Sequence, residues 1–141
     1  MRLDRIIRNT GGIFTAGDSA AEIDSICCDS RKVTRGSLFV AVKGFAADGH
    51  EYISRAIGKG ARAVVYEDQE LTDFQTSAMA LEGIALIKVE SSRKALAIMA
   101  ANFYDNPSEK LTLVGITGTN GKTTTVTLLY RMFMALGYNC G

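Results

Sequence analysis

The sequence predicts an α/β fold with a mostly parallel or mixed sheet, and two observations lead to this prediction. First, short apolar segments alternate with segments of helical periodicity over residues 1–106, which is typical of a sheet covered by helices. Second, a continuous apolar segment leads into a glycine-rich loop and another helix over residues 111–141. The polar segment "DNPSEK" at 105–110 holds the only proline and separates the two parts, so we expect a domain boundary there.

The N-terminal part begins with a short helix and two strands. Leu3, Ile6 and Ile7 share one helical face, and a Gly-Gly pair ends this helix. The segment "EIDSICC" predicts a short strand, and the polar loop "DSRKVTRG" at 29–36 follows it. The next segment, at 37–42, is apolar and rich in β-branched residues, so it predicts a stronger strand.

A helix is predicted after the loop "GFAADGHE". Asp48 and Glu51 have the spacing of a capping box, in which two side chains satisfy the first backbone N–H groups of a helix. Gly60 suits the C-terminal cap of the same helix. His50, the only histidine, lies near the helix start, where we expect it to be exposed and solvated. The side chains expected to be buried are Tyr52, Ile53, Ala56 and Ile57.

Two strands and a helix complete this part. The apolar segments "RAVVYE" and "IALIKV" predict strands at 62–67 and 84–89, and the polar residues 68–82 between them are expected at the surface. The segment "SSRKALAIMAANFYDN" predicts a helix with Ser91 or Ser92 as its N-cap.

The segment "LTLVGITGTNGKTTTV" has the order strand, glycine turn, Gly-Lys-Thr, helix. Residues 111–117 predict a strand buried on both faces. The glycines after it let backbone N–H groups converge on phosphate oxygens, and the helix N-terminus adds partial positive charge. Lys122 can contact the β- and γ-phosphates of a nucleotide, and the Thr123 hydroxyl can bind Mg²⁺. Ile116 stands where the generic phosphate-loop pattern has glycine, so the prediction depends on the surrounding elements.

The residues predicted to bind ATP are Gly118, Thr119, Asn120, Gly121, Lys122, Thr123 and Thr124. The helix after them is apolar on nearly every side, through Val126, Leu128, Leu129, Met132, Phe133, Met134 and Leu136. Such a helix is expected to be buried, and one strand with one helix cannot bury itself in water. We therefore expect residues 111–141 to be the incomplete start of an ATP-binding domain.

Composition excludes several function classes. The net charge is +1, from 16 basic and 15 acidic residues, so neither nucleic acid nor an anionic membrane is an expected partner. Three cysteines without a C-x-x-C pair argue against a disulfide framework or a zinc site, and Cys27 is expected to be a small buried hydrophobe. The N-terminus lacks the apolar core of a signal peptide, so we expect a cytoplasmic protein with reduced thiols.

The string "GITGTNGKTTT" resembles the ATP-binding loop of the Mur ligase family, and folylpolyglutamate and cyanophycin synthetases carry related loops. The first part resembles the N-terminal domain of the Mur ligases that add the third residue to the peptidoglycan precursor, the MurE type. The matching pieces are "DSR", "GSLFVA", "DGH" and the Gly-Ala pair at 60–61, together with "FYDNPSEKL" before the loop. The resemblance extends from about residue 24 to the end of the chain.

The resemblance implies that residues 1–106 form a Mur-ligase-type α/β domain that binds the UDP end of UDP-MurNAc-L-Ala-D-Glu. It implies that ATP and Mg²⁺ activate the substrate carboxylate as an acyl phosphate, which the amine of a diamino acid then attacks. Lys122 would be the catalytic residue and Thr123 the metal ligand. The residues implied or suited to bind the UDP-substrate are Cys28, Ser30, Arg31, Phe45, Ala46, Ala47 and Asp48.

Alternatives remain at the level of sequence. Asp48 and Glu51 could serve only as a helix cap, and Arg31 could form a structural ion pair with Asp29 or Asp48. The chain could be a stand-alone UDP-sugar-binding module without catalysis, or part of another P-loop amide ligase such as a folylpolyglutamate synthetase. Because the amino-acid site and further Mg²⁺ ligands are expected outside the sequence, we predict that the 141-residue chain has no ligase turnover.

Overall fold

The computed structural model describes residues 1–44, 48–67, 77, 79 and 82–141. The chain divides into two units, Met1–Pro107 and Ser108–Gly141, and each is described by itself. Most of the predicted surface segment 68–82 and the candidate residues Phe45, Ala46 and Ala47 lie outside the described residues.

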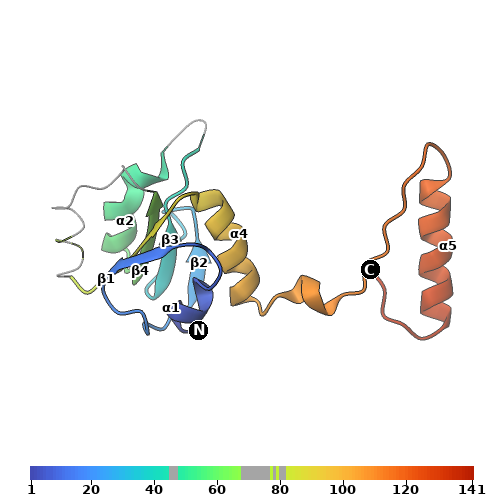
Figure 1. Cartoon of the computed structure of the whole chain (residues 1–141), viewed down its shortest axis with the longest axis horizontal. Helices are drawn as coiled ribbons and strands as arrows, with labels where there is room; N and C mark the ends of the chain where they lie inside the picture. Colours follow the sequence, from blue (N-terminus) through green and yellow to red (C-terminus); the bar gives the residue numbers. More distant parts are fainter. Residues whose placement is uncertain (45–47, 68–76, 78, 80–81) are drawn as a thin grey trace. The chain divides into compact units, whose positions relative to one another are not determined.

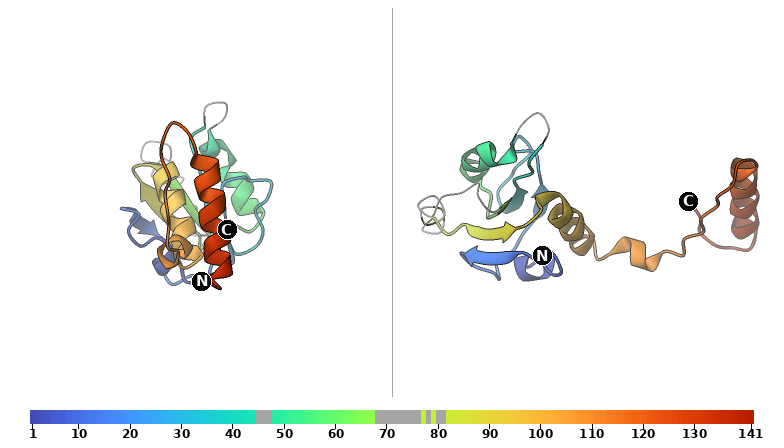
Figure 2. Two further views of the ribbon diagram at one scale, coloured as in Figure 1. Left: turned by 90° about the vertical axis from the view of Figure 1, so that its right-hand side faces the viewer. Right: turned by 45° about the horizontal axis from the view of Figure 1, so that its top comes forward.

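The first unit is built on a five-stranded mixed sheet with the order β1-β5-β4-β3-β2 (Figure 1). Four neighbouring strands run parallel, and β1 pairs antiparallel with β5 at one edge (Figure 2). The strands are β1 (Ile13–Ala16), β2 (Ser25–Cys27), β3 (Ser37–Val40), β4 (Ala63–Glu67) and β5 (Ala85–Val89). The predicted α/β fold with a mostly parallel or mixed sheet is therefore confirmed.

Strand β1 is the element that the sequence analysis missed. It has four residues, is partly exposed, and has an irregular register with β5 between Phe14 and Ala16. The Thr15 hydroxyl lies 3.2 Å from both the Tyr66 hydroxyl and the Leu86 carbonyl oxygen, and it donates to the latter. A short edge strand has too little periodicity to be distinguished from a loop.

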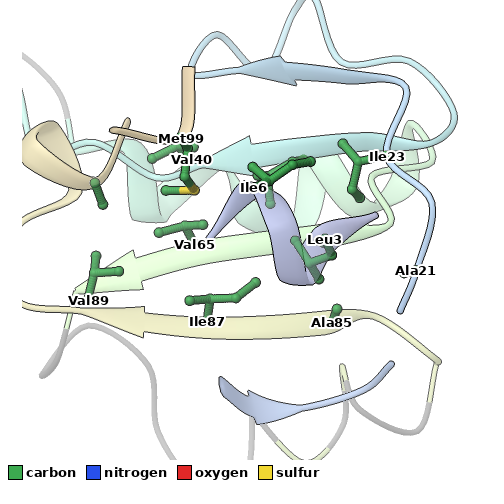
Figure 3. Close-up of a cluster of buried hydrophobic side chains, with 13 residues drawn as sticks. Leu3, Ile6, Ala21, Ile23, Val40, Val65, Ala85, Ile87, Val89 and Met99 are labelled. Carbon is green, nitrogen blue, oxygen red and sulfur yellow. The ribbon is translucent and has the colours of Figure 1, made fainter. Parts of the chain in front are cut away.

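Helices cover both faces of the sheet. Helices α1 (Leu3–Ile6) and α4 (Ser92–Phe103) pack with Val40, Val65 and Ile87 in one buried cluster (Figure 3). On the opposite face, α2 (Ile53–Gly58) packs with Phe39, Val64 and Leu86. Successive strand residues thus enter opposite cores, which explains why these strands are continuously apolar.

The ends of the helices follow the predicted caps. Ser91 is the N-cap of α4, and its hydroxyl accepts a hydrogen bond from the Lys94 N–H at 3.5 Å. Gly60 has a positive φ of 95° after α2, and its N–H donates to the Ile57 carbonyl at 2.8 Å. A left-handed glycine at this position closes the helix because it carries no Cβ.

The predicted helix after Asp48 differs in its first turn. The Asp48 side chain does cap it, but Gly49–Tyr52 form a 3-10 turn, and α2 begins only at Ile53. Ile53 and Ala56 are buried as predicted, whereas Tyr52 is 37% exposed and the prediction that it is buried is wrong. The 3-10 turn rotates the chain by about 120° per residue instead of about 100°, so Tyr52 points to a different side.

The second unit contains α5 (Lys122–Ala135), and a 3-10 turn at Pro107–Lys110 precedes it. As predicted, the helix ends before Gly137, which has a φ of 87°. The Tyr138 N–H donates to the Phe133 carbonyl at 3.0 Å, and the two rings meet edge to face. This is a Schellman-type helix end with its usual apolar contact.

One prediction for this unit, the strand at 111–117, is wrong in the structure. Residues 111–117 do not form a strand, and Leu113 is 78% exposed. No residue of α5 is buried, and Leu129 and Phe133 are half-buried. A strand needs hydrogen bonds from a neighbouring strand, and none of the strands in the described residues pairs with this segment. No helix among those residues is long and apolar enough to cross a membrane.

Candidate functional site

An open pocket of about 370 Å³ lies beyond the carboxyl ends of β2 and β3. Its lining residues are Cys28, Asp29, Ser30, Arg31, Val42, Gly49, Tyr52 and Arg55. The structure thus brings together three of the residues predicted to bind the UDP-substrate: Cys28, Ser30 and Arg31. The carboxyl ends of parallel strands are the usual place for ligands in α/β sheets.

Ser30 and Cys28 contribute different groups to this pocket. Ser30 is only 7% exposed, and no hydrogen bond to its hydroxyl is found among the described residues. The hydroxyl is not among the buried polar atoms that lack a partner, so it is accessible and suited to bind a polar ligand atom. Cys28 is exposed and so is not a core residue, whereas Cys27 is half-buried. Burial raises the pKa of the Cys27 thiol.

Arg31 and Asp29 form an ion pair at the pocket wall. The Arg31 Nε and Nη2 donate to the Asp29 carboxylate at 3.0 and 2.9 Å, and the Arg31 backbone N–H donates to it at 2.9 Å. The Arg31 side chain lowers the pKa of Asp29 to about 2. One of the ion pairs considered for Arg31 is therefore present. Lys59 fixes the same loop, because its Nζ donates to the Arg31 carbonyl oxygen at 2.7 Å.

Tyr52 and Arg55 line the pocket and were not predicted as site residues. They follow Gly49 at intervals of three residues. The 3-10 turn places Gly49 and Tyr52 on the same side, and Arg55, three residues further on in α2, lies on that side as well. The expected α-helix placed Tyr52 in the core and gave no reason to single out Arg55. The signal that could have found them is this spacing of three, which is visible only once the turn type is known.

A hydrogen-bonded chain of buried and half-buried side chains lies beside the pocket. His50 is 9% exposed, so the prediction of an exposed, solvated histidine is wrong. Its backbone N–H and its Nδ1 lie 2.9 and 2.5 Å from the Asp48 Oδ1. Its Nε2 accepts the Glu67 backbone N–H at 3.0 Å. Because a backbone N–H can only donate, Nε2 carries no proton, and the neutral ring donates through Nδ1.

The chain continues into α4. Glu67 Oε1 accepts the backbone N–H and the hydroxyl of Ser92 at 2.9 and 2.7 Å. These bonds lower the pKa of Glu67, and the His50 N–H in the same way lowers the pKa of Asp48. Lys43 Nζ lies 3.9 Å from Asp48 Oδ2 and adds positive charge. Asp48 is thus a cap and an acceptor for His50, and it does not line the pocket.

The glycine-rich loop of the second unit has two glycines with positive φ. Gly118 and Gly121 have φ values of 149° and 77°. Gly121 is the N-cap of α5 and offers no side-chain cap, so the first N–H groups of the helix are available to a ligand. Lys122 Nζ donates to the Gly118 and Thr119 carbonyl oxygens at 2.5 and 3.3 Å. These residues fit a phosphate group.

Few of the described residues could bind a metal ion. No group of three or more His, Cys, Asp or Glu side chains that could hold a metal ion occurs in the described residues. Thr123, in the first turn of α5, is exposed. Its hydroxyl is one oxygen ligand of the kind that Mg²⁺ accepts together with nucleotide phosphates. Thr123 as a Mg²⁺ ligand stays a prediction.

Comparison with known proteins agrees with these observations. The model of the Mur ligase family, catalytic domain, matches residues 22–104. The chain is 49% identical over 141 residues to the UDP-N-acetylmuramoyl-L-alanyl-D-glutamate--2,6-diaminopimelate ligase of Cytophaga hutchinsonii. The alignment covers all of this chain and 28% of that enzyme. Identity to the enzyme of the same name from Phocaeicola vulgatus is 45%, with the same coverage.

The fold is also similar to solved structures. The UDP-N-acetylmuramoylalanyl-D-glutamyl-2,6-diaminopimelate--D-alanyl-D-alanyl ligase of Acinetobacter baumannii matches 96% of this chain and 28% of its own length. The TM-score is 0.61 and the sequence identity 25%. A MurF structure from the same organism gives a TM-score of 0.62. The chain therefore spans 28% of the length of these relatives.

Proposed function

The chain belongs to the Mur ligase family, and on that premise we propose that it forms the UDP-substrate-binding part and the start of the ATP site of a MurE-type ligase. The observation that carries this proposal is the pocket at the ends of β2 and β3, where Ser30 and Arg31 meet. Identity of 49% to a MurE-type relative over the whole chain supports it.

The proposed ligand of the pocket is the UDP end of UDP-MurNAc-L-Ala-D-Glu. Arg55 supplies a guanidinium group for a diphosphate, and Arg donors match phosphate oxygens well. Arg31 adds the N–H donors that its ion pair with Asp29 leaves open. The Ser30 hydroxyl and the Tyr52 side chain supply a polar contact and an aromatic surface for the nucleoside. The predicted contacts of Phe45, Ala46 and Ala47 remain proposals without a described geometry.

The proposed role of the second unit is to bind the phosphates of ATP. The N–H groups at the start of α5 and the Lys122 ammonium would hold the phosphates, and Thr123 would be a ligand of Mg²⁺. Bound ATP would supply the phosphoryl group that activates the substrate carboxylate, while Lys122 neutralises charge. The relatives are named for 2,6-diaminopimelate, and we propose the same diamino acid for the complete ligase.

The test is a calorimetric titration of the 141-residue chain with UDP-MurNAc-L-Ala-D-Glu. Binding with a preference over GDP is expected, and amide NMR shifts should be centred on Ser30, Gly49 and Arg55. Equal affinity for GDP, or shifts elsewhere, would contradict the assignment. Other measurements test the alternative functions. Substrate-dependent ADP release by this chain would overturn its predicted inactivity, and a folylpolyglutamate synthetase fragment would bind no UDP-substrate.

A further inference from the structure

We propose that His50 is a positioning residue for the pocket: it ties the turn that carries Gly49 and Tyr52 to the end of β4. This inference rests on the proposed function, because it assigns a role in binding the UDP-substrate. His50 does not itself line the pocket. It acts through the turn in which it lies: Nδ1 bonds to Asp48 at the start of that turn, and Nε2 accepts from Glu67 at the end of β4.

The turn is held at two points. At Gly49, an added Cβ would lie 2.5 Å from the Val42 nitrogen and 2.7 Å from its carbonyl oxygen, so the turn lies directly against the chain after β3. The Gly49 N–H also donates to the Val42 carbonyl at 3.0 Å. The second point is the hydrogen bond from the Glu67 N–H to the His50 Nε2 at 3.0 Å. Together these two contacts restrict how far the turn can move relative to β3 and β4.

The side chains that this turn presents are those that face the ligand. Gly49, Tyr52 and Arg55 line the pocket, and they lie on the 3-10 turn and the first part of α2. The opposite wall, formed by Cys28 to Arg31, belongs to the loop after β2, and Lys59, the C-cap of α2, donates to the Arg31 carbonyl oxygen of that loop. The distance between the two walls therefore depends on this bond and on where the turn is held against β3 and β4.

The bonding pattern requires one form of the ring. Nδ1 must carry the proton that is donated to Asp48, and Nε2 must be free to accept. A proton on Nε2 would place two N–H donors against each other and break the bond to β4. The charged groups around the ring are Asp48 on its own turn and Glu67 at the end of β4, and Lys43 after β3 lies 3.9 Å from the Asp48 carboxylate.

Variants of His50 can distinguish the hydrogen bond to the Glu67 N–H, which we call the anchor, from a role of the side chain in packing alone. In His50→Gln, the side-chain carbonyl can replace Nε2 as acceptor, whereas His50→Leu keeps an apolar volume without any acceptor. We expect His50→Leu to weaken binding of UDP-MurNAc-L-Ala-D-Glu about tenfold, since a buried donor loses its partner. We expect His50→Gln to stay within about threefold of the native chain, because its hydrogen bond is retained.

Two further measurements keep the result decisive. Nitrogen NMR of the native ring should show the neutral form with the proton on Nδ1, and a proton on Nε2 would overturn the inference without any ligand. Native-like binding by His50→Leu would also overturn it. If the native chain binds no UDP-substrate while the ring has the expected form, the proposed function fails and the anchor remains. If His50→Leu does not fold, native-like folding and binding of His50→Gln supports the proposal. Weak binding by a folded His50→Gln contradicts it.

Discussion

Glu67 Oε1 accepts both the backbone N–H and the hydroxyl of Ser92, at 2.9 and 2.7 Å. The last residue of β4 thereby caps the first turn of α4, which follows the neighbouring strand. A carboxylate at this position also interacts favourably with the positive end of the helix dipole. The Glu67 side chain thus joins β4 to α4 on the side of the sheet where the parallel strands end, which is also the side of the pocket.

Removal of this cap should destabilise the first unit. Glu67→Ala leaves the Ser92 N–H and hydroxyl without their acceptor, and we expect a loss of about 1–2 kcal/mol in the free energy of unfolding. Urea denaturation followed by circular dichroism measures the change. Glu82→Ala, at an exposed residue before β5, is the matched control and should change stability by less than about 0.5 kcal/mol. Equal effects of the two variants would show that the cap contributes nothing.

Acid should destabilise the fold through the same carboxylates. Hydrogen bonds lower the pKa values of Glu67 and Asp48 from their ordinary 4.5 and 3.8. The folded state therefore binds fewer protons than the unfolded state below about pH 4.5. Their contribution is complete above that pH and is lost as the pH falls through the lowered pKa values. Unfolding free energies measured from pH 6 to pH 3 should show this decline, and Glu67→Gln should make it shallower. An identical slope in this variant would contradict the assignment.

The close approach at Gly49 offers a steric test. Gly49→Ala would place a methyl group 2.5 Å from the Val42 backbone, so the turn must shift, and we expect a destabilisation of about 1–3 kcal/mol. Gly58→Ala is the matched control in α2, since nothing lies within 4 Å of its added Cβ. The control should be stabilised by about 0.5–1 kcal/mol through higher helix propensity. Thermal unfolding should therefore move in opposite directions, and a shift in the same direction would argue against the close packing.

Arg55 should contribute to affinity for the UDP-substrate. Arg55→Gln removes one of the two pocket guanidinium groups, and a lost charge-assisted hydrogen bond predicts about tenfold weaker binding. Arg62→Gln removes an equal charge just before β4, at the opposite end of the strand from the pocket. Titration calorimetry at two salt concentrations should find a change only in Arg55→Gln. A similar loss in both variants would indicate a general charge effect.

Lys122 should be needed for the phosphate loop to bind a nucleotide. Its Nζ now contacts the Gly118 and Thr119 carbonyl oxygens, so it lies within the loop that the phosphates would enter. Lys122→Ala should abolish the amide NMR shifts that Mg-ATP produces in residues 118–124. Arg131→Ala, near the other end of α5, is the control and should keep them. Unchanged shifts in Lys122→Ala would remove this lysine from the proposed site.

Much of the first unit could be predicted from sequence because its signals are local. The parallel strands β3, β4 and β5 are continuous apolar segments, and Ser91 and Gly60 act as the caps that their residue types predict. In the pocket, Ser30 and Arg31 lie in the loop that follows β2, at the carboxyl end of a parallel strand.

The errors arise where a residue depends on distant partners. His50 is buried because the end of β4 supplies a donor to its ring, and no pattern near residue 50 reveals that contact. Tyr52 faces the pocket because the turn is 3-10, and the capping pattern does not distinguish turn types. The apolar residues 111–117 indicate a strand, but pairing depends on a neighbour that the described residues do not provide.

The pairing of β1 with β5 has a consequence for synthesis of the protein. Ile13 of the edge strand β1 lies opposite Lys88 of β5, so the two paired residues are separated in sequence by most of the first unit. During translation, the nascent chain exposes its first strand while the ribosome completes the other four. Because such non-local pairing is slow to form, we expect the N-terminal segment to become protected from proteases last, after residue 89 has left the exit tunnel.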